Sequence, residues 1–484
     1  MDQRHLTTVG SWLRANQGWL DALDQAIRAR RGPRGLPIAP LFAGLLYNLL
    51  DHQPPTITAV HTTFVHKCEP KQRLLLGLAP GLVPSLHAFY RSLERLKQAV
   101  ADGRVDALLV SDPELVGAEA PLDAERRLAV LLDCIVRSTV PPPGDERLWS
   151  ADTTYIDANC RPISRARYDA GERASDPDAS GRRLKRPNGT EKQIFGYAIT
   201  TVVRSEGTRE FVDALRVDTA SAHDRPKVVE MARRLTDDGY PIERLAIDRG
   251  IKSQDLNAGL RAVGIEPVFD FDANEGGLEG AYRGLLIVDG WLYSPALPER
   301  LRQPMAKPLP VSPDAQDKAA QWKRDMEERD HYAWRVRQTL GPGKVQLYSP
   351  LRVGCQHPTL RHTMRNRDLA LATCSGDHDS DEACGMETVV WEATRAPISW
   401  QNPHRGSRRW QTEYAKRSSV ERGYSLLKSS DLIQLKNKAI KLRGRIKFAL
   451  MVAIAFAATN LHLASLTARR PENKQPNPPI PRAA

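Results

Sequence analysis

The chain has 484 residues, of which 41% are hydrophobic and 26% are charged. These proportions are ordinary for a globular protein with a large core, and they exclude a chain that is disordered throughout. Lysine and arginine number 70 against 58 acidic residues, so the formal net charge is +12 at pH 7. This excess favours polyanionic partners such as nucleic acid, although a basic enzyme with a solvated surface accounts for the charge equally well.

The cellular compartment is predicted from features that the sequence lacks. The first ten residues have no basic start followed by an apolar run, so we expect no secretory signal. The longest apolar stretch, 448–459, is shorter than the roughly 20 residues that a bilayer requires, and it predicts a buried helix. The few cysteines suggest reduced thiols rather than a disulfide framework. We therefore expect a cytoplasmic protein with no membrane partner.

Residues 1–140 have the apolar spacing of an all-α domain. Helices are expected near 39–50, 58–67, 85–100 and 123–139, after a first helical segment around Leu13–Ile27. The helices at 39–50 and 58–67 are separated by Gln53, Pro54 and Pro55, and two helices joined by a short turn suit a helix-turn-helix DNA-binding unit. A plain helical bundle fits the same pattern. The Pro-Pro-Pro-Gly segment at 141–144 predicts a domain boundary.

From 145 to 273 the pattern becomes that of a mixed α/β domain. Strands are expected at 148–158, 194–203, 210–217, 244–247 and 267–271, with helices at 225–238 and 254–263. The arginine-rich stretch 161–192 is expected to be an exposed loop. The resulting order, three successive strands followed by alternating helices and strands, is typical of a mixed sheet with helical crossovers.

The remaining chain divides into three parts. Residues 274–400 are expected to form an insertion with short strands at 285–293, 344–348 and 388–391 and a charged helix near 315–329. Residues 401–468 are helical, and the proline-rich tail 469–484 is expected to be disordered. The insertion also contains a possible zinc-ligand set: Cys355, His357, Cys374 and Cys384. Structural zinc sites usually have a closely spaced cysteine pair, which is absent here, so we expect scattered thiols and keep zinc as the alternative.

Polar side chains gather around Glu421 in the C-terminal helical part. Four lie within about 60° of one face of a continuous helix with about 100° per residue: Tyr414, Arg417, Glu421 and Lys428. Beside them runs an apolar stripe suited to packing on a sheet: Val420, Tyr424 and Leu427. A carboxylate flanked by cations and a phenol suits phosphate handling at a metal site. An ordinary solvated face with an Arg–Glu pair is the alternative.

The spacing Tyr-x2-Arg-x3-Glu-x6-Lys resembles the signature of bacterial insertion-sequence transposases of the DDE type. The resemblance covers roughly 145–465 and implies an RNase H-like catalytic domain. In that domain one Asp lies on the first strand, a second follows the fourth strand, and a Glu lies on a late helix. Asp152, Asp248 and Glu421 match these places, with a long insertion before the last.

The implied chemistry is cleavage and joining of DNA by two Mg²⁺ ions, for which Mn²⁺ can substitute. Asp152 is expected to bridge the ions, with Asp248 and Glu421 each holding one, because Mg²⁺ prefers carboxylates and water. The resemblance also implies phosphate contacts for Tyr414, Arg417 and Lys428. It suggests stacking on a displaced base for Trp400 or Trp391, although a buried structural tryptophan is the commoner situation.

The resemblance therefore implies a transposase that binds terminal inverted repeats, cuts them and transfers their 3′-OH ends to target DNA. We expect a homodimer on double-stranded DNA at the bacterial nucleoid. The alternative is a DNA-binding protein or nuclease derived from a transposase, without strand transfer. Asp157 competes with Asp152 but lies on the opposite strand face, while Asp270 and Asp272 come after the second-acid position. Glu413 is expected to point away from Glu421.

Overall fold

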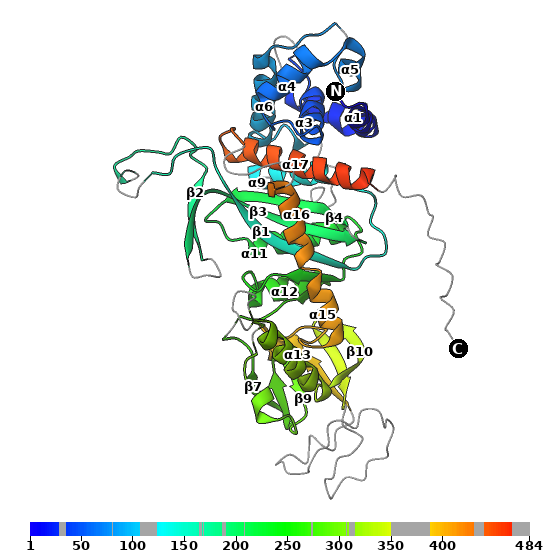
Figure 1. Cartoon of the computed structure of the whole chain (residues 1–484), viewed down its shortest axis with the longest axis vertical. Helices are drawn as coiled ribbons and strands as arrows, with labels where there is room; N and C mark the ends of the chain where they lie inside the picture. The colour runs from blue at the N-terminus through cyan, green and yellow to red at the C-terminus, as the bar shows by residue number, and fades with distance from the viewer. Residues whose placement is uncertain are drawn as a thin grey trace, which may run out of the picture.

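The computed structural model describes residues 1–28, 35–79, 81–106, 123–163, 167, 169–185, 190–207, 209–272, 274–305, 307–308, 315–349, 388–429 and 440–466. These parts form three tiers along the longest axis of the molecule (Figure 1). N-terminal helices form one end, a curled mixed sheet the middle, and a smaller strand-rich part the other end. The protein is thus of mixed α/β class, as the sequence predicts.

All the regular secondary structure described in the N-terminal tier is helical. Its elements are α1 (Gln3–Ala15), α2 (Gln17–Ile27), α3 (Ile38–Leu50), α4 (Ile57–Thr62), the π-helical turn η1 (Thr63–Lys67), α5 (Pro70–Leu75) and α6 (Leu86–Ala101). Side chains of Asp2, Thr56 and Ser85 cap α1, α4 and α6 by accepting hydrogen bonds from backbone N–H groups in the first turn. The expected helices at 39–50, 58–67 and 85–100 are therefore confirmed to within a few residues.

Helix α3 is apolar on every side, and all its residues except Ala39 are buried. A helix of this kind belongs inside a protein. It contacts α1, α2, α4 and α6, so it is the centre of the N-terminal tier. At the surface of this tier, His66 and Lys67 at the end of η1 are exposed.

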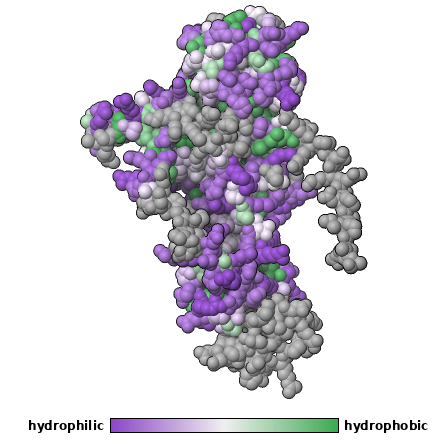
Figure 2. Space-filling view, viewed as in Figure 1, coloured by the Kyte–Doolittle hydropathy of each residue, from purple (hydrophilic) through white to green (hydrophobic). Residues whose placement is uncertain are grey.

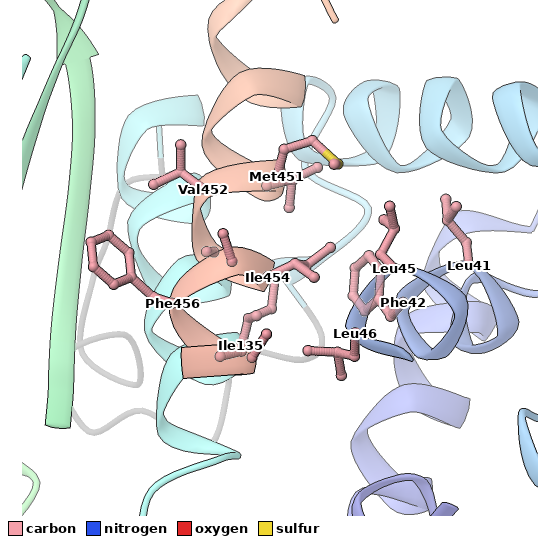
Figure 3. Packing of buried hydrophobic residues seen from close by; sticks show 14 of the residues in the cluster. Leu41, Phe42, Leu45, Leu46, Ile135, Met451, Val452, Ile454 and Phe456 are labelled. Atoms are coloured by element: carbon pink, nitrogen blue, oxygen red, sulfur yellow. The ribbon is translucent and has the colours of Figure 1, made fainter. Parts of the chain in front are cut away.

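The long helix α17 (Arg445–Ser465) joins the N-terminal tier to the sheet. It packs against α3 on one side and against β4 on another, and Figure 3 shows Leu46 of α3 pointing toward α17. Among the described residues it is the one helix long and apolar enough to cross a membrane, and 78% of its apolar window is buried inside the protein. It is a core helix, as expected for the stretch 448–459.

The central sheet has six strands: β1 (Leu148–Asp157), β2 (Ser180–Lys185), β3 (Glu191–Glu206), β4 (Arg209–Thr219), β5 (Arg244–Ile247) and β6 (Glu266–Val268). β1 lies between β3, to which it is antiparallel, and β5, to which it is parallel; β6 is parallel to β5. β2 and β4 pair with successive parts of β3. The expectation that 161–192 is entirely loop is wrong at β2, whose sequence shows no apolar alternation.

Helices cover both faces of the sheet. α11 (Arg225–Asp237) and α12 (Gln254–Ala262) pack on one face, in a core that includes Trp149 and Ala151 of β1. α16 (Ser418–Ser429) and α17 pack on the other, in a core that includes Ile156 of β1 and extends into the N-terminal helices. The segment 141–144 therefore connects parts of one continuous core.

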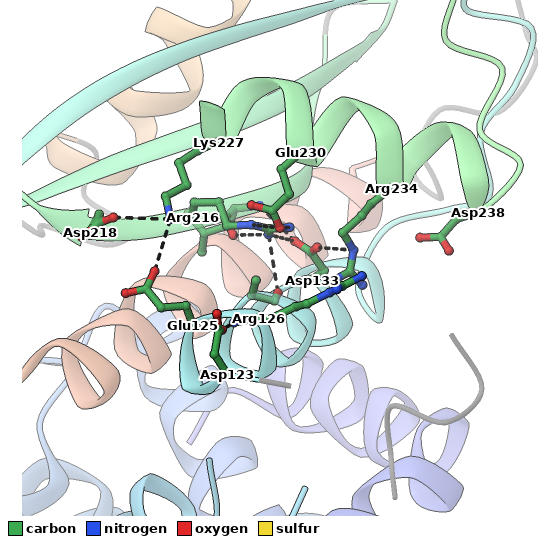
Figure 4. Close-up of polar contacts among 12 residues, drawn as sticks. Asp123, Glu125, Arg126, Asp133, Arg216, Asp218, Lys227, Glu230, Arg234 and Asp238 are labelled. Carbon is green, nitrogen blue, oxygen red and sulfur yellow. Dashed lines mark hydrogen bonds and ion pairs between the residues drawn. The ribbon is translucent and has the colours of Figure 1, made fainter. Parts of the chain in front are cut away.

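Helix α9 (Ala124–Arg137), expected with the N-terminal helices, packs against β4 and α17. A buried ion cluster fixes it there (Figure 4). Arg216 of β4 donates from Nη1 to Asp133 of α9 at 2.8 Å and from Nη2 to Glu230 of α11 at 2.9 Å. The neighbouring guanidinium groups outweigh the effect of burial and lower the pKa of Asp133, so its carboxylate stays charged inside the protein.

The strand-rich tier corresponds to the expected insertion. Its elements are β7 (Leu278–Tyr282), β8 (Leu285–Val288), β9 (Trp291–Tyr293), η2 (Glu299–Leu301), α13 (Ala315–His331), β10 (Arg335–Gly341), β11 (Lys344–Tyr348), β12 (Thr388–Glu392) and η4 (Ala393–Arg395). They form two three-stranded antiparallel sheets around one shared core. The single strand expected at 285–293 is a hairpin, because Asp289 and Gly290 both have positive φ and form a tight turn.

Buried charges hold the insertion against the central sheet. Arg405 donates to Asp270, which follows β6, at 2.7 Å, and to Asp289 of the insertion hairpin at 3.0 Å. Arg329 of α13 donates to the same Asp289 carboxylate at 2.6 Å. Removing one member of such a buried set leaves an uncompensated charge.

The face of the molecule shown in Figure 2 is mostly hydrophilic.

The junction of α3 with the core yields a stability prediction. Leu46 is 1% exposed, whereas Leu74 of α5 is 58% exposed. Leu46→Ala should lower the free energy of unfolding by about 2–5 kcal/mol, because it leaves a cavity. Leu74→Ala, the matched control, should change it by less than about 0.5 kcal/mol. Urea denaturation followed by circular dichroism measures both, and equal shifts would contradict this packing.

Candidate active site

Parallel pairing of β1 and β5 places two carboxylates side by side. Ser150 pairs with Ala246 and Ala151 with Ile247, so the same register puts Asp152 beside Asp248, directly after β5. Adjacent strands lie about 4.8 Å apart, and residues two apart share a face. Leu148 and Ala246 pack in the core next to α15 (Arg408–Ala415), so Asp152 and Asp248 face the side of the sheet that carries α15 and α16.

Helix α16 brings the third carboxylate to the same place. Val420, Tyr424 and Leu427 are buried against the sheet, which confirms the apolar stripe expected from the sequence. Glu421 lies beside this stripe with an exposed side chain. Arg417 connects the acids, because its Nη1 lies 2.7 Å from Glu421 Oε1 and 3.4 Å from Asp248 Oδ1.

Asp152 has the most perturbed electrostatic environment of the three. Its pKa is raised to about 7, mainly by burial and in smaller part by the negative charges of Asp248 and Glu421. The Thr153 backbone N–H and Arg417 act in the opposite direction. The three acids of the expected set therefore form one electrostatic cluster, although they come from distant parts of the sequence.

The donor chemistry of this cluster fits a hard divalent cation. Carboxylate oxygens are the ligands that Mg²⁺ and Mn²⁺ accept, and a cation beside Asp152 would offset the cost of burying its charge. Within the described segments, no three His, Cys, Asp or Glu side chains are already arranged around a single metal position. Arg417 instead bridges two of the acids, so holding an ion requires local side-chain rearrangement.

Tyr414 belongs to a different helix from Glu421. The continuous helix assumed from the sequence is interrupted, because α15 ends at Ala415 and a turn at Lys416 and Arg417 precedes α16. The Tyr414 ring stacks on Trp410 at 5.1 Å, and the Arg417 guanidinium lies 5.8 Å from its centre. Tyr414 thus stays next to Arg417. Lys428 lies on α16, but its side chain is outside the described residues.

The expectation that Trp400 contacts DNA is not supported by its position. Its side chain is 0% exposed, in the core of the insertion. The Arg261 guanidinium lies 4.8 Å from its ring centre, and Trp291 is a further ring neighbour. Trp391 is equally buried and donates its indole N–H to the Gly290 carbonyl. Both are structural tryptophans, which is the alternative weighed above.

The competing acids have structural partners. Asp157 accepts a hydrogen bond from the Phe195 backbone N–H and lies an odd number of residues from Asp152, hence on the other face of β1. Asp270 pairs with Arg405, and Asp272 lies 3.2 Å from Arg249. Glu413 pairs with Arg244 and Arg409, away from the cluster. The possible zinc ligands lie outside the described residues: Cys355, His357, Cys374 and Cys384.

Sequence reasoning missed several polar groups between β1 and α16. Tyr424 was assigned only to the apolar stripe, yet its hydroxyl donates to the Asp152 main-chain carbonyl at 2.6 Å. Ser150 Oγ donates to the Lys416 carbonyl at 3.0 Å, and Ser419 Oγ lies 3.3 Å from Ser150 Oγ. Helical spacing gives no signal for such contacts, because it places a residue on a face without naming its partner.

Comparison with models of known protein families gives no match for this chain. A search of curated proteins likewise finds no significant match. The site must therefore be interpreted from its own geometry.

The raised pKa of Asp152 gives a testable pH dependence. Its folded value, about 7, lies above the ordinary 3.8, so the folded state binds the proton more tightly than the unfolded state. The contribution of Asp152 to stability is therefore fully present below about pH 4 and is lost as pH rises to about 7. In EDTA, the difference in unfolding free energy between wild type and Asp152→Asn should change across this window. Asp157→Asn is the control, and a flat difference for Asp152→Asn contradicts the assignment.

Proposed function

We propose that this protein is a DNA transposase of the DDE type that cuts and joins DNA with two divalent metal ions. The observation that carries the proposal is the meeting of Asp152, Asp248 and Glu421 beside Arg417 at one place on the sheet. These are the three acids that the resemblance assigns to the metal site.

The arrangement of strands supports an RNase H-like catalytic domain. Leaving β2 aside, the chain forms the antiparallel strands β1, β3 and β4, followed by β5 parallel to β1. Asp152 then lies on the first strand, Asp248 directly after the fourth, and Glu421 on a late helix behind the insertion. This is the placement that such a domain requires.

In the proposed reaction Asp152, Asp248 and Glu421 hold the ions. When bound, two Mg²⁺ ions activate the attacking oxygen and neutralise charge on the leaving oxygen. No protein nucleophile is needed: water makes the first cut, and the freed 3′-hydroxyl attacks target DNA. The chain itself supplies the carboxylates, fixes their relative positions and binds the phosphates around them.

Arg417 is the group best placed to bind a phosphate next to the carboxylates. Its guanidinium offers a planar fork of donors that matches two phosphate oxygens. It already lies within ion-pair distance of two acids, so a phosphate bound there is adjacent to the metal site. Tyr414, whose ring stacks on Trp410 next to Arg417, and Lys428 on α16 are proposed as further phosphate contacts.

The proposed substrates are the terminal inverted repeats of an insertion sequence and a target duplex. We propose that the N-terminal tier recognises the sequence of the terminal repeats, and that the α4–η1 segment makes the contacts with the DNA bases. We propose that two copies act together on paired ends in the bacterial cytoplasm, at the nucleoid. Hydrolysis without joining, as in a derived nuclease, needs the same carboxylates, so a strand-transfer assay separates the two activities.

Conservative substitution of each acid tests the metal site. Asp152→Asn, Asp248→Asn and Glu421→Gln should each lower Mg²⁺-dependent cleavage of end DNA by roughly a thousandfold or more, because metal stabilisation is worth several kcal/mol and each 1.4 kcal/mol is tenfold. Binding of end DNA should survive. Asp157→Asn, on the other face of the same strand, should cleave normally. Cleavage retained in all three variants would falsify the proposal.

The reader assignment is tested on exposed side chains, since removing residues 1–140 would strip the packing partner of α17. Replacing His66 and Lys67 together with alanine should weaken binding of end DNA by about tenfold or more and random DNA less, if they contact bases. Lys97→Ala on α6, a partly exposed cation elsewhere on this tier, is the control. Competition binding measures the preference, and an unchanged preference places the reader elsewhere.

A further inference from the structure

The interface between β1 and α16 contains a polar contact that joins the helix carrying Glu421 to the strand carrying Asp152. Tyr424 lies one helical turn after Glu421 and is only 6% exposed. Its hydroxyl donates to the main-chain carbonyl of Asp152 at 2.6 Å. The same hydroxyl accepts a hydrogen bond from Thr201 Oγ1 of β3 at 2.9 Å. One phenol oxygen therefore connects α16, β1 and β3.

The apolar contacts of α16 with the sheet restrain its position less. Val420 and Leu427 pack through apolar surface, and such contacts are not directional. They oppose separation of the helix from the sheet but permit small shifts along it. A hydrogen bond restrains both distance and angle. The position of Glu421 relative to Asp152 therefore depends on the polar contacts of α16 with the sheet. One of these is made to β4, where the Arg422 guanidinium donates to Glu210 Oε1 at 2.7 Å, and the others are made to β1 and β3.

A second polar contact restrains the other end of the same interface. Ser150, two residues before Asp152, donates to the Lys416 carbonyl at the turn before α16. Ser419 of α16 lies within hydrogen-bond distance of Ser150 Oγ. On α16 the two contacts, at Ser419 and Tyr424, lie on either side of Glu421. On β1 they lie at Ser150 and at Asp152 itself.

We propose that Tyr424 is a positioning residue: its hydroxyl sets the distance between Glu421 and Asp152 and so determines how tightly the site holds divalent metal. The inference rests on the proposed function of the three acids. Tyr424 touches neither DNA nor metal in this role and acts through the main chain of Asp152. Misplacing a reacting group by about 1 Å can cost about a hundredfold in rate, so a single hydrogen bond at this point has a measurable effect.

The chain offers a closely matched control in Tyr197 of β3. Its side chain is buried in the same core, and its hydroxyl donates one hydrogen bond to Asp176 Oδ1 at 2.8 Å. Its ring stacks on Phe448 of α17 at 4.3 Å. Tyr197→Phe removes the same atom from the same core as Tyr424→Phe, but at a place not connected to Asp152. A purely structural role for Tyr424 predicts the same behaviour in both variants.

The experiment measures metal binding and cleavage in the full-length protein. Mn²⁺ alone is titrated without DNA and followed by electron paramagnetic resonance, and Mg²⁺ is titrated in end cleavage. Tyr424→Phe should weaken Mn²⁺ binding and raise the half-saturating Mg²⁺ concentration by about tenfold, within the hundredfold range for a misplaced group. Tyr197→Phe should leave both at wild-type values. Thermal melting monitors the folding of both variants.

The outcomes separate the inference from the function on which it rests. A wild-type protein that neither binds Mn²⁺ nor cleaves overturns the proposed function and this inference together. A wild-type protein that does both, with Tyr424→Phe behaving like Tyr197→Phe, overturns only the positioning role. Thr201→Val should reproduce part of the Tyr424→Phe effect and add nothing to it in the double variant. Full additivity overturns the linked arrangement of the two hydroxyls.

Discussion

The parallel register of β1 and β5 is the constraint on which the site depends. It places Asp152 and Asp248 at equivalent points of adjacent strands, on one face, without any direct bond between their side chains. Burial of Asp152 and, in smaller part, this proximity raise the pKa of its carboxyl group. Arg417 offsets part of the repulsion among the carboxylates, because its guanidinium forms ion pairs with Asp248 and Glu421. Like charges collected by the fold in this way are characteristic of places that bind cations.

Much of the architecture follows from local pattern. In the strands around Asp152 and Asp248 and in the helices between them, apolar residues recur with the spacing of a strand or a helix. These elements lie close to their expected bounds. The apolar stripe through Val420 likewise predicts which side of α16 meets the sheet. These features are readable because periodicity and burial are local properties of the chain.

Other features depend on tertiary partners, which periodicity does not reveal. β2 forms because β3 offers it an edge, although its own residues do not alternate. Trp400 gives the same sequence signal whether it stacks on a base or fills a core, and only packing decides between them. The hydrogen bond of the Tyr424 hydroxyl could not be predicted for the same reason, since its partner lies more than two hundred residues away along the chain.

The burial of α17 has a consequence for any engineering of the N-terminal tier, which we propose as the part that selects DNA. Because this helix from the far end of the chain packs against α3, the two helices are parts of one core. A chimera that exchanges only the N-terminal tier would pair a foreign α3 with the resident α17 and leave mismatched cavities between them. Grafts that carry both helices together keep their native complementarity, so the N-terminal tier and α17 are best exchanged as a set.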